Sequence, residues 1–143
     1  MQIASRFTIA VHIVACIDYF QKSTSVTSAF LAGSVGVNRV VIRTLMTKLK
    51  EAGIIAISRG KTGVRLGRRS EEISLYDVYK AVESVDESGL FNWHSSPNPL
   101  CPVGKNVRRA LGETLVKAQL SMEKELKSAT IADLTAELHK VAD

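Results

Sequence analysis

The chain has 143 residues, the size of one ordinary domain, and 45% of them are hydrophobic, which supports a core and excludes a disordered chain. No apolar run approaches the ~20 residues that span a bilayer, and no signal-peptide cleavage pattern follows the N-terminus, so we expect a cytoplasmic protein. The two cysteines, Cys16 and Cys101, exclude a disulfide scaffold and a self-contained zinc site.

The net charge of +5 is unevenly distributed along the chain. Between Arg39 and Arg69 there are nine Lys or Arg residues and one acid, Glu51, whereas twelve acids outnumber eight bases from Ser70 onward. A basic block of this kind is expected of a surface that meets phosphates. A solvated charged face gives the same clustering and is the alternative.

Three helices are predicted first. Apolar side chains at helical spacing predict a helix over residues 3–20, a shorter one follows over about 27–35, and Gly36 suits the tight turn after it. Asn38 is a good N-cap for the third helix, which ends at Gly53. One face of that helix is apolar, with Ile42, Leu45, Met46 and Leu49. The opposite face is left to solvent or to DNA and carries Val40, Arg43, Thr44, Thr47 and Lys48.

A β-hairpin and a fourth helix come next. The β-branched run 54–57 and residues 64–66 predict two short strands, joined by a turn at 59–63 with a basic tip. Ser74 begins the fourth helix, and Asp77 in its first turn suits the positive end of the helix dipole. Its buried stripe comprises Leu75, Val78, Tyr79 and Val82.

Residues 86–102 contain all three prolines and have no period, which predicts a long loop. From about residue 103 a long helix follows, and then a short one with Thr130 as N-cap and Asp133 as its capping-box partner. The apolar stripe of the long helix comprises Val107, Leu111, Leu115, Ala118, Met122 and Leu126. Because this stripe is long for so small a domain, we expect a second copy of the chain to bury it in a homodimer. The alternative is that the stripe folds back on its own domain.

This order of elements predicts a winged helix-turn-helix: a mostly α fold with a small β-hairpin wing and a long C-terminal dimerisation helix. We expect a DNA-binding domain at residues 1–85, a loop and candidate sensor region at 86–102, and the dimerisation helix with the terminal short helix at 103–143. The alternative is a helical domain whose basic hairpin has no role in binding.

The third helix is expected to enter a major groove about 12 Å wide. Arg43 is predicted to read bases, because an arginine bonds guanine O6 and N7 together, and Val40 and Thr44 to meet thymine methyls or base edges. Phosphate contacts are assigned to Arg39, Thr47, Lys61 and Arg65, and a narrow minor groove to Arg59. The complete candidate DNA-binding set is Asn38, Arg39, Val40, Arg43, Thr44, Thr47, Arg59, Lys61 and Arg65.

Three segments resemble the Rrf-two family of bacterial winged helix-turn-helix transcription regulators: LMTKLKEAGII at 45–55, SRGKTGVRL at 58–66 and SLYDVYKAVE at 74–83. The segment NPLCPVGKN at 98–106 is most similar to the YwnA-like branch of that family. The resemblance covers most of the chain. It implies a homodimer joined through the long C-terminal helix, which binds a pseudo-palindromic operator in double-stranded DNA.

The sequence departs from the family in the loop before the long helix. Cluster-binding members hold an iron–sulfur centre there with three cysteines, whereas Cys101 is alone, so we expect no cluster, metal or cofactor. Cys16, among apolar neighbours, is expected to be a small buried hydrophobe. Cys101 precedes the positive end of a helix, with Lys105, Arg108 and Arg109 nearby, and a thiolate there is stabilised. It is either a redox sensor or an inert loop residue.

We find neither a set of Ser, His and acid nor a glycine-rich phosphate loop in the sequence, so we do not expect an enzyme. His94 beside Trp93 is a candidate ligand or part of a small-molecule sensing pocket in the 86–102 loop, although a Trp in such a loop more often anchors it to the core. His12 is expected to be structural.

Three functions compete: a dimeric DNA-binding regulator, expected to be a repressor; a winged-helix module for protein contact; and a small enzyme or metal protein built around His94 and Cys101. The basic block favours the first over the second, and the lack of a paired acid and base disfavours the third.

Overall fold

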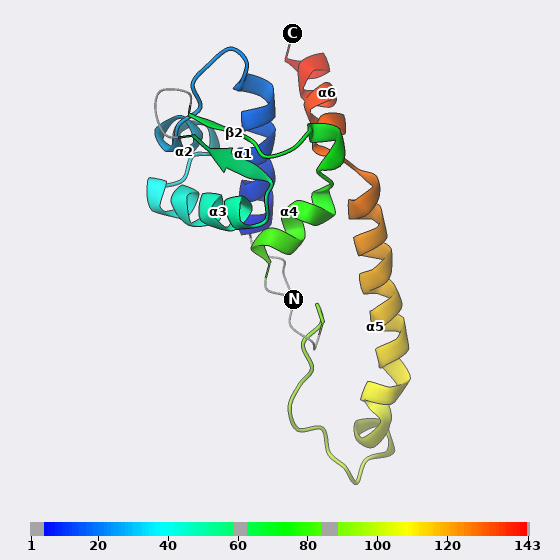
Figure 1. The fold of residues 1–143 in the computed structure, drawn as a ribbon. Helices are drawn as coiled ribbons and strands as arrows, with labels where there is room; N and C mark the ends of the chain where they lie inside the picture. Colours follow the sequence, from blue (N-terminus) through cyan, green and yellow to red (C-terminus); the bar gives the residue numbers. More distant parts are fainter. Residues whose placement is uncertain (1–4, 59–62, 84–88, 143) are drawn as a thin grey trace.

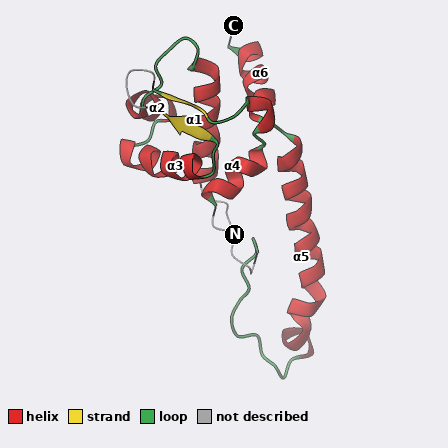
Figure 2. Ribbon diagram, in the orientation of Figure 1, coloured by secondary structure: helices red, strands yellow, loops and turns green. Residues whose placement is uncertain are grey.

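The computed structural model describes residues 5–58, 63–83 and 89–142. A layer of helices and one hairpin forms a body, and a long helix extends away from it (Figure 1; Figure 2 shows the helices and strands). The elements are α1 (Arg6–Phe20), α2 (Ser28–Val35), α3 (Arg39–Glu51), β1 (Ile55–Ile57), β2 (Val64–Leu66), a 3-10 helix η1 (Ser70–Glu72), α4 (Leu75–Val82), α5 (Pro102–Ser128) and α6 (Ile131–Val141). The predicted fold class is confirmed.

Helix α1 lies at the centre of the body. It contacts α2 and α3 on one side and α4 and α6 on the other, which explains why Ala10, Ile13 and Ile17 are completely buried. Cys16 is buried in the same helix, as the sequence predicted. The core that α1 organises therefore holds the other helices of the body in place.

Helices α2 and α3 form the predicted helix-turn-helix. They are bent by 112° across a three-residue break, within the ~90–120° of this motif. Gly36 turns the chain with φ +80°, a conformation that favours glycine. Thr27 and Asn38 cap the two helices, since their side-chain oxygens accept hydrogen bonds from the N–H groups of Phe30 (3.1 Å) and Val41 (3.0 Å).

The hairpin is antiparallel, with Ile55 opposite Leu66 and Ile57 opposite Val64. Its second strand is also tied to the segment before α2, because the Val64 N–H donates to the Val26 carbonyl at 2.8 Å. Gly63 makes this close approach with φ +70°. The hairpin is therefore attached to the helix-turn-helix at both of its strands, since β1 also packs on α3.

The chain after the hairpin differs from the prediction in two places. The η1 turn was not expected, and α5 begins at Pro102, in the first-turn position that suits proline. The predicted capping box of α6, Thr130 with Asp133, is present. Ser74 and Asp77 form a second capping box at α4, where the sequence analysis expected only a favourable dipole contact from Asp77.

The last helix returns to the body. The Ile131 N–H donates to the Ile73 carbonyl and the Leu75 N–H to the Ala129 carbonyl, at 2.8 and 2.9 Å, and α6 packs on α1. The division of the chain into three segments stays a prediction, but α6 lies with the N-terminal body in space (Figure 1). The described part of the chain has no single helix both long and apolar enough to cross a bilayer, although the bent pair α2 and α3 has the length and composition of a broken span.

Candidate nucleic-acid interface

Helix α3 presents two chemically different faces. Ile42, Leu45, Met46 and Leu49 are buried, as predicted, and fix the helix on the body. The other face is open to solvent, and Val40 is 70% exposed there. Arg39, Arg43, Thr44 and Thr47 are exposed as well, and Lys48 is half-buried. The helix therefore offers a surface of basic, hydroxyl and methyl groups held rigidly by its apolar side.

Some polar groups on this face already have partners. The Thr44 hydroxyl donates to the Val40 carbonyl at 2.9 Å, and the Thr47 hydroxyl to the Arg43 carbonyl at 3.0 Å. Each threonine thus has its hydroxyl proton engaged and its oxygen lone pairs available as acceptors. The side-chain oxygen of Asn38 caps the helix, so its amide N–H groups are what it can offer to an outside acceptor.

The basic block divides into paired and unpaired cations. Arg68 donates to the Asp77 carboxylate at 3.1 Å and to the Glu72 carbonyl at 3.2 Å, and Arg69 lies 3.4 Å from the Glu71 carboxylate. Within residues 5–58, 63–83 and 89–142, Arg39, Arg43 and Arg65 make no ion pair. The positive charge that remains uncompensated is therefore on α3 and on β2.

The wing supplies one described cation. Arg65 is exposed in the middle of β2, opposite Ala56 of β1. The hairpin lies beside α2 and α3 (Figure 1). Arg59 and Lys61, the other two wing residues of the candidate set, lie outside the described residues.

Cys101 directly precedes α5. The backbone N–H groups of Gly104 and then Val103 lower the pKa of its thiol, because they stabilise the thiolate at the helix N-terminus. The expected cations are not among the causes of this shift in pKa. The Arg108 guanidinium instead lies 5.7 Å over the Trp93 ring and donates to the His94 carbonyl at 3.2 Å. The thiol is partly accessible.

Trp93 anchors the loop to α5 and not to the core of the body. It is half-buried against a small hollow of about 180 Å³ that Leu115 and Val116 also line. The loop is further held by the Leu90 N–H, which donates to the Gln119 side-chain oxygen at 3.0 Å. His94 has no second or third ligand with which to bind a metal ion, since the described residues contain no cluster of three His, Cys, Asp or Glu side chains.

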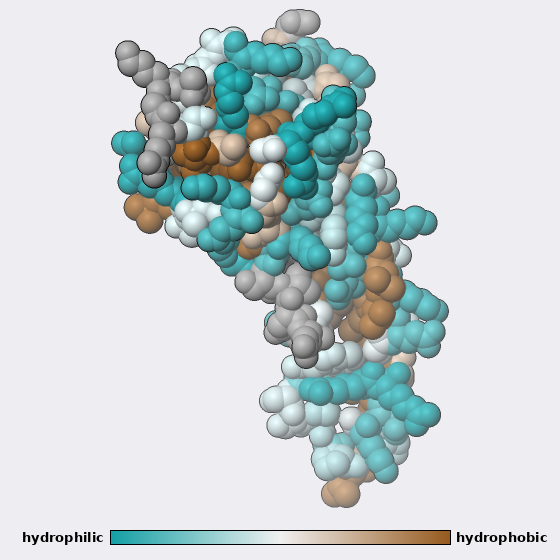
Figure 3. All heavy atoms as spheres, viewed as in Figure 1, coloured by the Kyte–Doolittle hydropathy of each residue, from teal (hydrophilic) through white to brown (hydrophobic). Residues whose placement is uncertain are grey.

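Helix α5 has no buried residue although it is 27 residues long, which is about 40 Å. Within the predicted stripe Leu111 is 42% exposed, Ala118 is exposed and the other members are half-buried. Three further apolar residues of α5 are outside the predicted stripe and are more exposed than Leu111: Val103, Val116 and Leu120. Val116 and Leu120 lie on the opposite face of the helix, whereas Val103 lies one turn before Val107. Hydrophobic surface is accordingly visible along α5 (Figure 3).

The chain is similar to known transcription regulators along most of its length. Residues 3–137 match the Rrf2 (Rrf-two) family, described as iron-dependent transcriptional regulators. YwnA of Bacillus subtilis (strain 168), named as a candidate HTH-type transcriptional regulator, is 40% identical over 132 residues, which are 92% of this chain and 96% of that protein.

Solved structures agree with this assignment. One described as a candidate DNA-binding protein is 35% identical, with a TM-score of 0.70 and coverage of 91% of this chain and 98% of its own. CymR, the global cysteine regulator of B. subtilis, shares the fold, with a TM-score of 0.72 at 18% identity over 95% of this chain and 97% of its own.

The family description raises the question of iron. The sequence has two cysteines: Cys16 is buried in α1, and Cys101 is the N-cap residue of α5. An iron–sulfur cluster needs about four ligands, mostly thiolates. The donor set of this chain does not fit a cluster in the loop before α5. Neither the exposed face of α3 nor the wing depends on such a group. The protein belongs to the Rrf2 family of DNA-binding transcription regulators, whose members are not enzymes.

Proposed function

We propose that this protein is a homodimeric repressor that binds a pseudo-palindromic promoter site in the cytoplasm. The observation that carries the proposal is the outer face of α3, on a helix whose inner face is buried. Arg39 and Arg43 are exposed there beside Val40, and neither has an ion-pair partner in the described part of the chain. A helix with a fixed apolar side and a basic, adaptable side is what a major groove requires.

Within this site the side chains differ in role. Arg43 reads a guanine, Val40 meets a thymine methyl, and Thr44 accepts from a base edge. Arg39, Thr47 and Arg65 bind phosphates, which position the protein without specifying sequence. The amide of Asn38 reaches a phosphate, because its oxygen is engaged as the cap of α3. Arg59 and Lys61 extend the phosphate and minor-groove contacts from the wing.

The dimer is proposed to form along α5. The helix buries none of its residues in one chain, which supports a partner copy over folding back on the same domain. Complete burial of a fully exposed leucine contributes about 1.5–3 kcal/mol, so Leu111, which is 42% exposed, would contribute roughly half of that or less. Two-fold symmetry doubles each contribution. Two copies of α3 would then meet half-sites about one helical turn apart, ~34 Å.

The input signal is proposed to act at Cys101. A thiol with a lowered pKa and partial exposure has the properties of an oxidant-responsive cysteine, and α5 connects it to the DNA-binding body. The thiolate attacks an oxygen of a peroxide, the O–O bond breaks with release of hydroxide, and a sulfenic acid forms. A second thiol then attacks the sulfenic sulfur, and a disulfide forms with release of water. Cys101 of a second copy is the available resolving thiol, since Cys16 is buried.

The test of DNA binding is the affinity for duplex DNA as salt is raised. Several phosphate contacts predict a loss of ~10³-fold or more between low and moderately high salt. Arg43→Ala is expected to relax sequence preference by about 1–3 kcal/mol at one base pair, whereas Arg65→Ala weakens operator and random DNA alike.

A charge-matched control makes the test specific. Arg109→Ala removes the same charge from α5 and is expected to leave the affinity unchanged. Equal losses on operator and random DNA for Arg43→Ala would contradict its base-reading role. Salt-insensitive affinity, or none, would favour the alternative of a winged-helix module for protein contact.

A further inference from the structure

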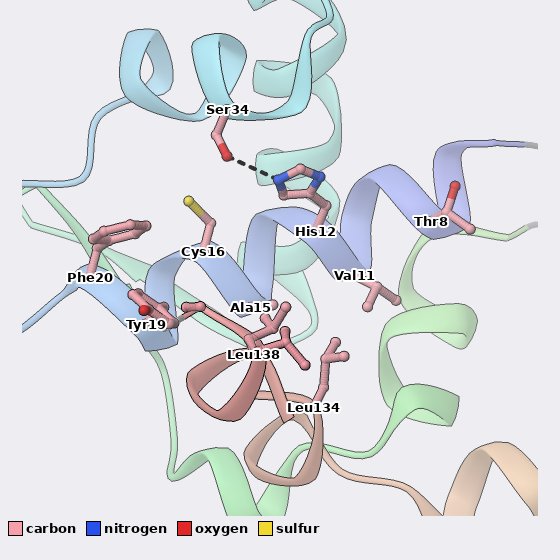
Figure 4. Close-up of a pocket in the computed structure, with 12 residues that line it drawn as sticks. Thr8, Val11, His12, Ala15, Cys16, Tyr19, Phe20, Ser34, Leu134 and Leu138 are labelled. Carbon is pink, nitrogen blue, oxygen red and sulfur yellow. Dashed lines mark hydrogen bonds between the residues drawn. The ribbon is translucent and has the colours of Figure 1, made fainter. Parts of the chain in front are cut away.

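A cavity of about 490 Å³ opens between α1, α2 and α6, away from α3, the wing and the loop that holds Cys101. Its walls are mostly apolar: Val11 and Ala15 of α1 face Leu134 and Leu138 of α6 across the opening (Figure 4). The volume lies within the ~300–1,000 Å³ of small-molecule sites, which are also predominantly apolar.

Three polar side chains of this cavity lie together, whereas Thr8 and Tyr19 line other parts of it (Figure 4). His12 Nε2 of α1 and Ser34 Oγ of α2 are 3.0 Å apart, and the Cys16 thiol lies beside them (Figure 4). Burial raises the pKa of the Cys16 thiol, and its hydrogen bond with Ser34 opposes the rise only in part. The thiol is therefore a neutral hydrogen-bonding group and not a nucleophile, so a ligand here binds without a covalent bond.

Among the residues that the structure describes, the lining contains no Asp, Glu, Lys or Arg side chain. A charged ligand would lose its hydration without gaining a partner of opposite charge, which is costly. An oxygen of an uncharged ligand, in contrast, can accept from or donate to the His12 and Ser34 pair. One wall is aromatic, since the Tyr19 ring is stacked on His139 with centroids 4.3 Å apart and planes at 17°.

We propose that this cavity binds an uncharged, bicyclic aromatic molecule that carries one hydrogen-bonding oxygen. An apolar cavity of about 150 Å³ holds benzene, so one about three times larger accommodates two fused rings. The rings lie between Val11 and Leu138, and the oxygen meets His12 and Ser34.

Occupancy of the cavity also reaches the DNA-binding surface, a consequence that rests on the proposed function. Ser34 belongs to α2 of the helix-turn-helix, and α6 follows α5 after only two residues. The first residue of α6 is also tied to the segment before α4, because the Ile131 N–H donates to the Ile73 carbonyl. A ligand between α2 and α6 favours one spacing of the DNA-binding body relative to the dimer helix. The ligand therefore changes DNA affinity to the extent that it binds one spacing better.

The experiment is calorimetric titration of the full-length protein with 1-naphthol in the absence of DNA. We expect saturable binding with a Kd below ~1 mM, and binding at least about tenfold weaker for naphthalene-1-sulfonate, which carries a charge. Leu138→Trp fills the cavity from its rim and is expected to abolish binding. Ala136→Trp places the same side chain on an exposed position of α6 outside the cavity and is the matched control. Ser34→Ala weakens binding roughly threefold to tenfold through one lost hydrogen bond.

Three results would overturn the site. These are absence of 1-naphthol binding to the unmodified protein, equal binding to the Leu138→Trp variant, and preferential binding of the sulfonate. If Leu138→Trp dissociates a dimer that Ala136→Trp leaves intact, the groove is an interface between copies and the ligand proposal is wrong. Failure of the unliganded protein to bind DNA refutes the proposed function but leaves the calorimetric result standing.

Discussion

Replacing Gly63 with alanine tests how the wing is attached to the helix-turn-helix. Gly63 has φ +70°, and a Cβ at this position would overlap the Val26 carbonyl oxygen and lie 2.9 Å from the Val26 nitrogen. Both of these Val26 atoms belong to the backbone, so the overlap cannot be relieved by the rotation of a side chain. The same carbonyl accepts the 2.8 Å hydrogen bond from the Val64 N–H, which the displaced chain would lose.

The magnitude follows from these contacts. A left-handed conformation costs a non-glycine residue about 1–2 kcal/mol, and a lost backbone hydrogen bond about 0.5–1.5 kcal/mol. With the steric displacement, we expect Gly63→Ala to lower the free energy of unfolding by about 2–4 kcal/mol. For a chain of this size that corresponds to a fall in Tm of roughly 6–16 °C.

The assay is thermal unfolding followed by circular dichroism at one fixed protein concentration, because dimerisation makes Tm depend on concentration. Gly33→Ala is the control, since Gly33 lies inside α2 and a Cβ added there would have no atom within 4 Å. It is expected to raise stability by about 0.5–1 kcal/mol. A Gly63→Ala variant as stable as the unmodified protein, or an equal loss in both variants, would refute this account of the wing.

Three further predictions concern the cap, the dimer and the thiol. Asn38→Ala is expected to cost about 1 kcal/mol of stability in thermal unfolding without DNA, and Asn38→Ser almost nothing; equal losses would show that the cap contributes nothing. Leu111→Glu is expected to raise the dimer dissociation constant, measured by sedimentation, ~100-fold or more, because a buried unpaired carboxylate costs about 3 kcal/mol or more. Leu120→Glu, on another face of α5, is expected to leave the dimer intact. The reverse pattern would move the interface to the Leu120 face. Because folding lowers the pKa of Cys101, its alkylation by iodoacetamide should reach half its maximal rate at a lower pH in the folded chain than in the urea-unfolded chain. Cys16, which is buried, should react only after unfolding. Coincident pH profiles for Cys101 in the two states, or an oxidant response that survives Cys101→Ser, would remove the basis for a sensor at Cys101.

Features that depend on neighbouring residues were predictable from the sequence. Thr27, Asn38, Ser74 and Thr130 cap their helices as local rules require, because a cap needs only the N–H groups of the next few residues. The buried face of α3 was also predictable, since its periodicity states which side of the helix avoids water. The η1 turn was missed because three residues carry too little pattern.

Contacts between distant segments were decided by the tertiary structure. Arg68 has the same charge as Arg43 in the sequence, but Asp77 neutralises the former and nothing described neutralises the latter. Likewise, the sequence did not indicate where α6 packs; in the structure it packs on α1 and lines the cavity beside His12. Local sequence thus determined the helices, their caps and the order of a winged helix-turn-helix. Only the packing of segments far apart in the chain decided which cations stay unpaired and where a cavity remains, because those outcomes depend on side chains that meet across the fold.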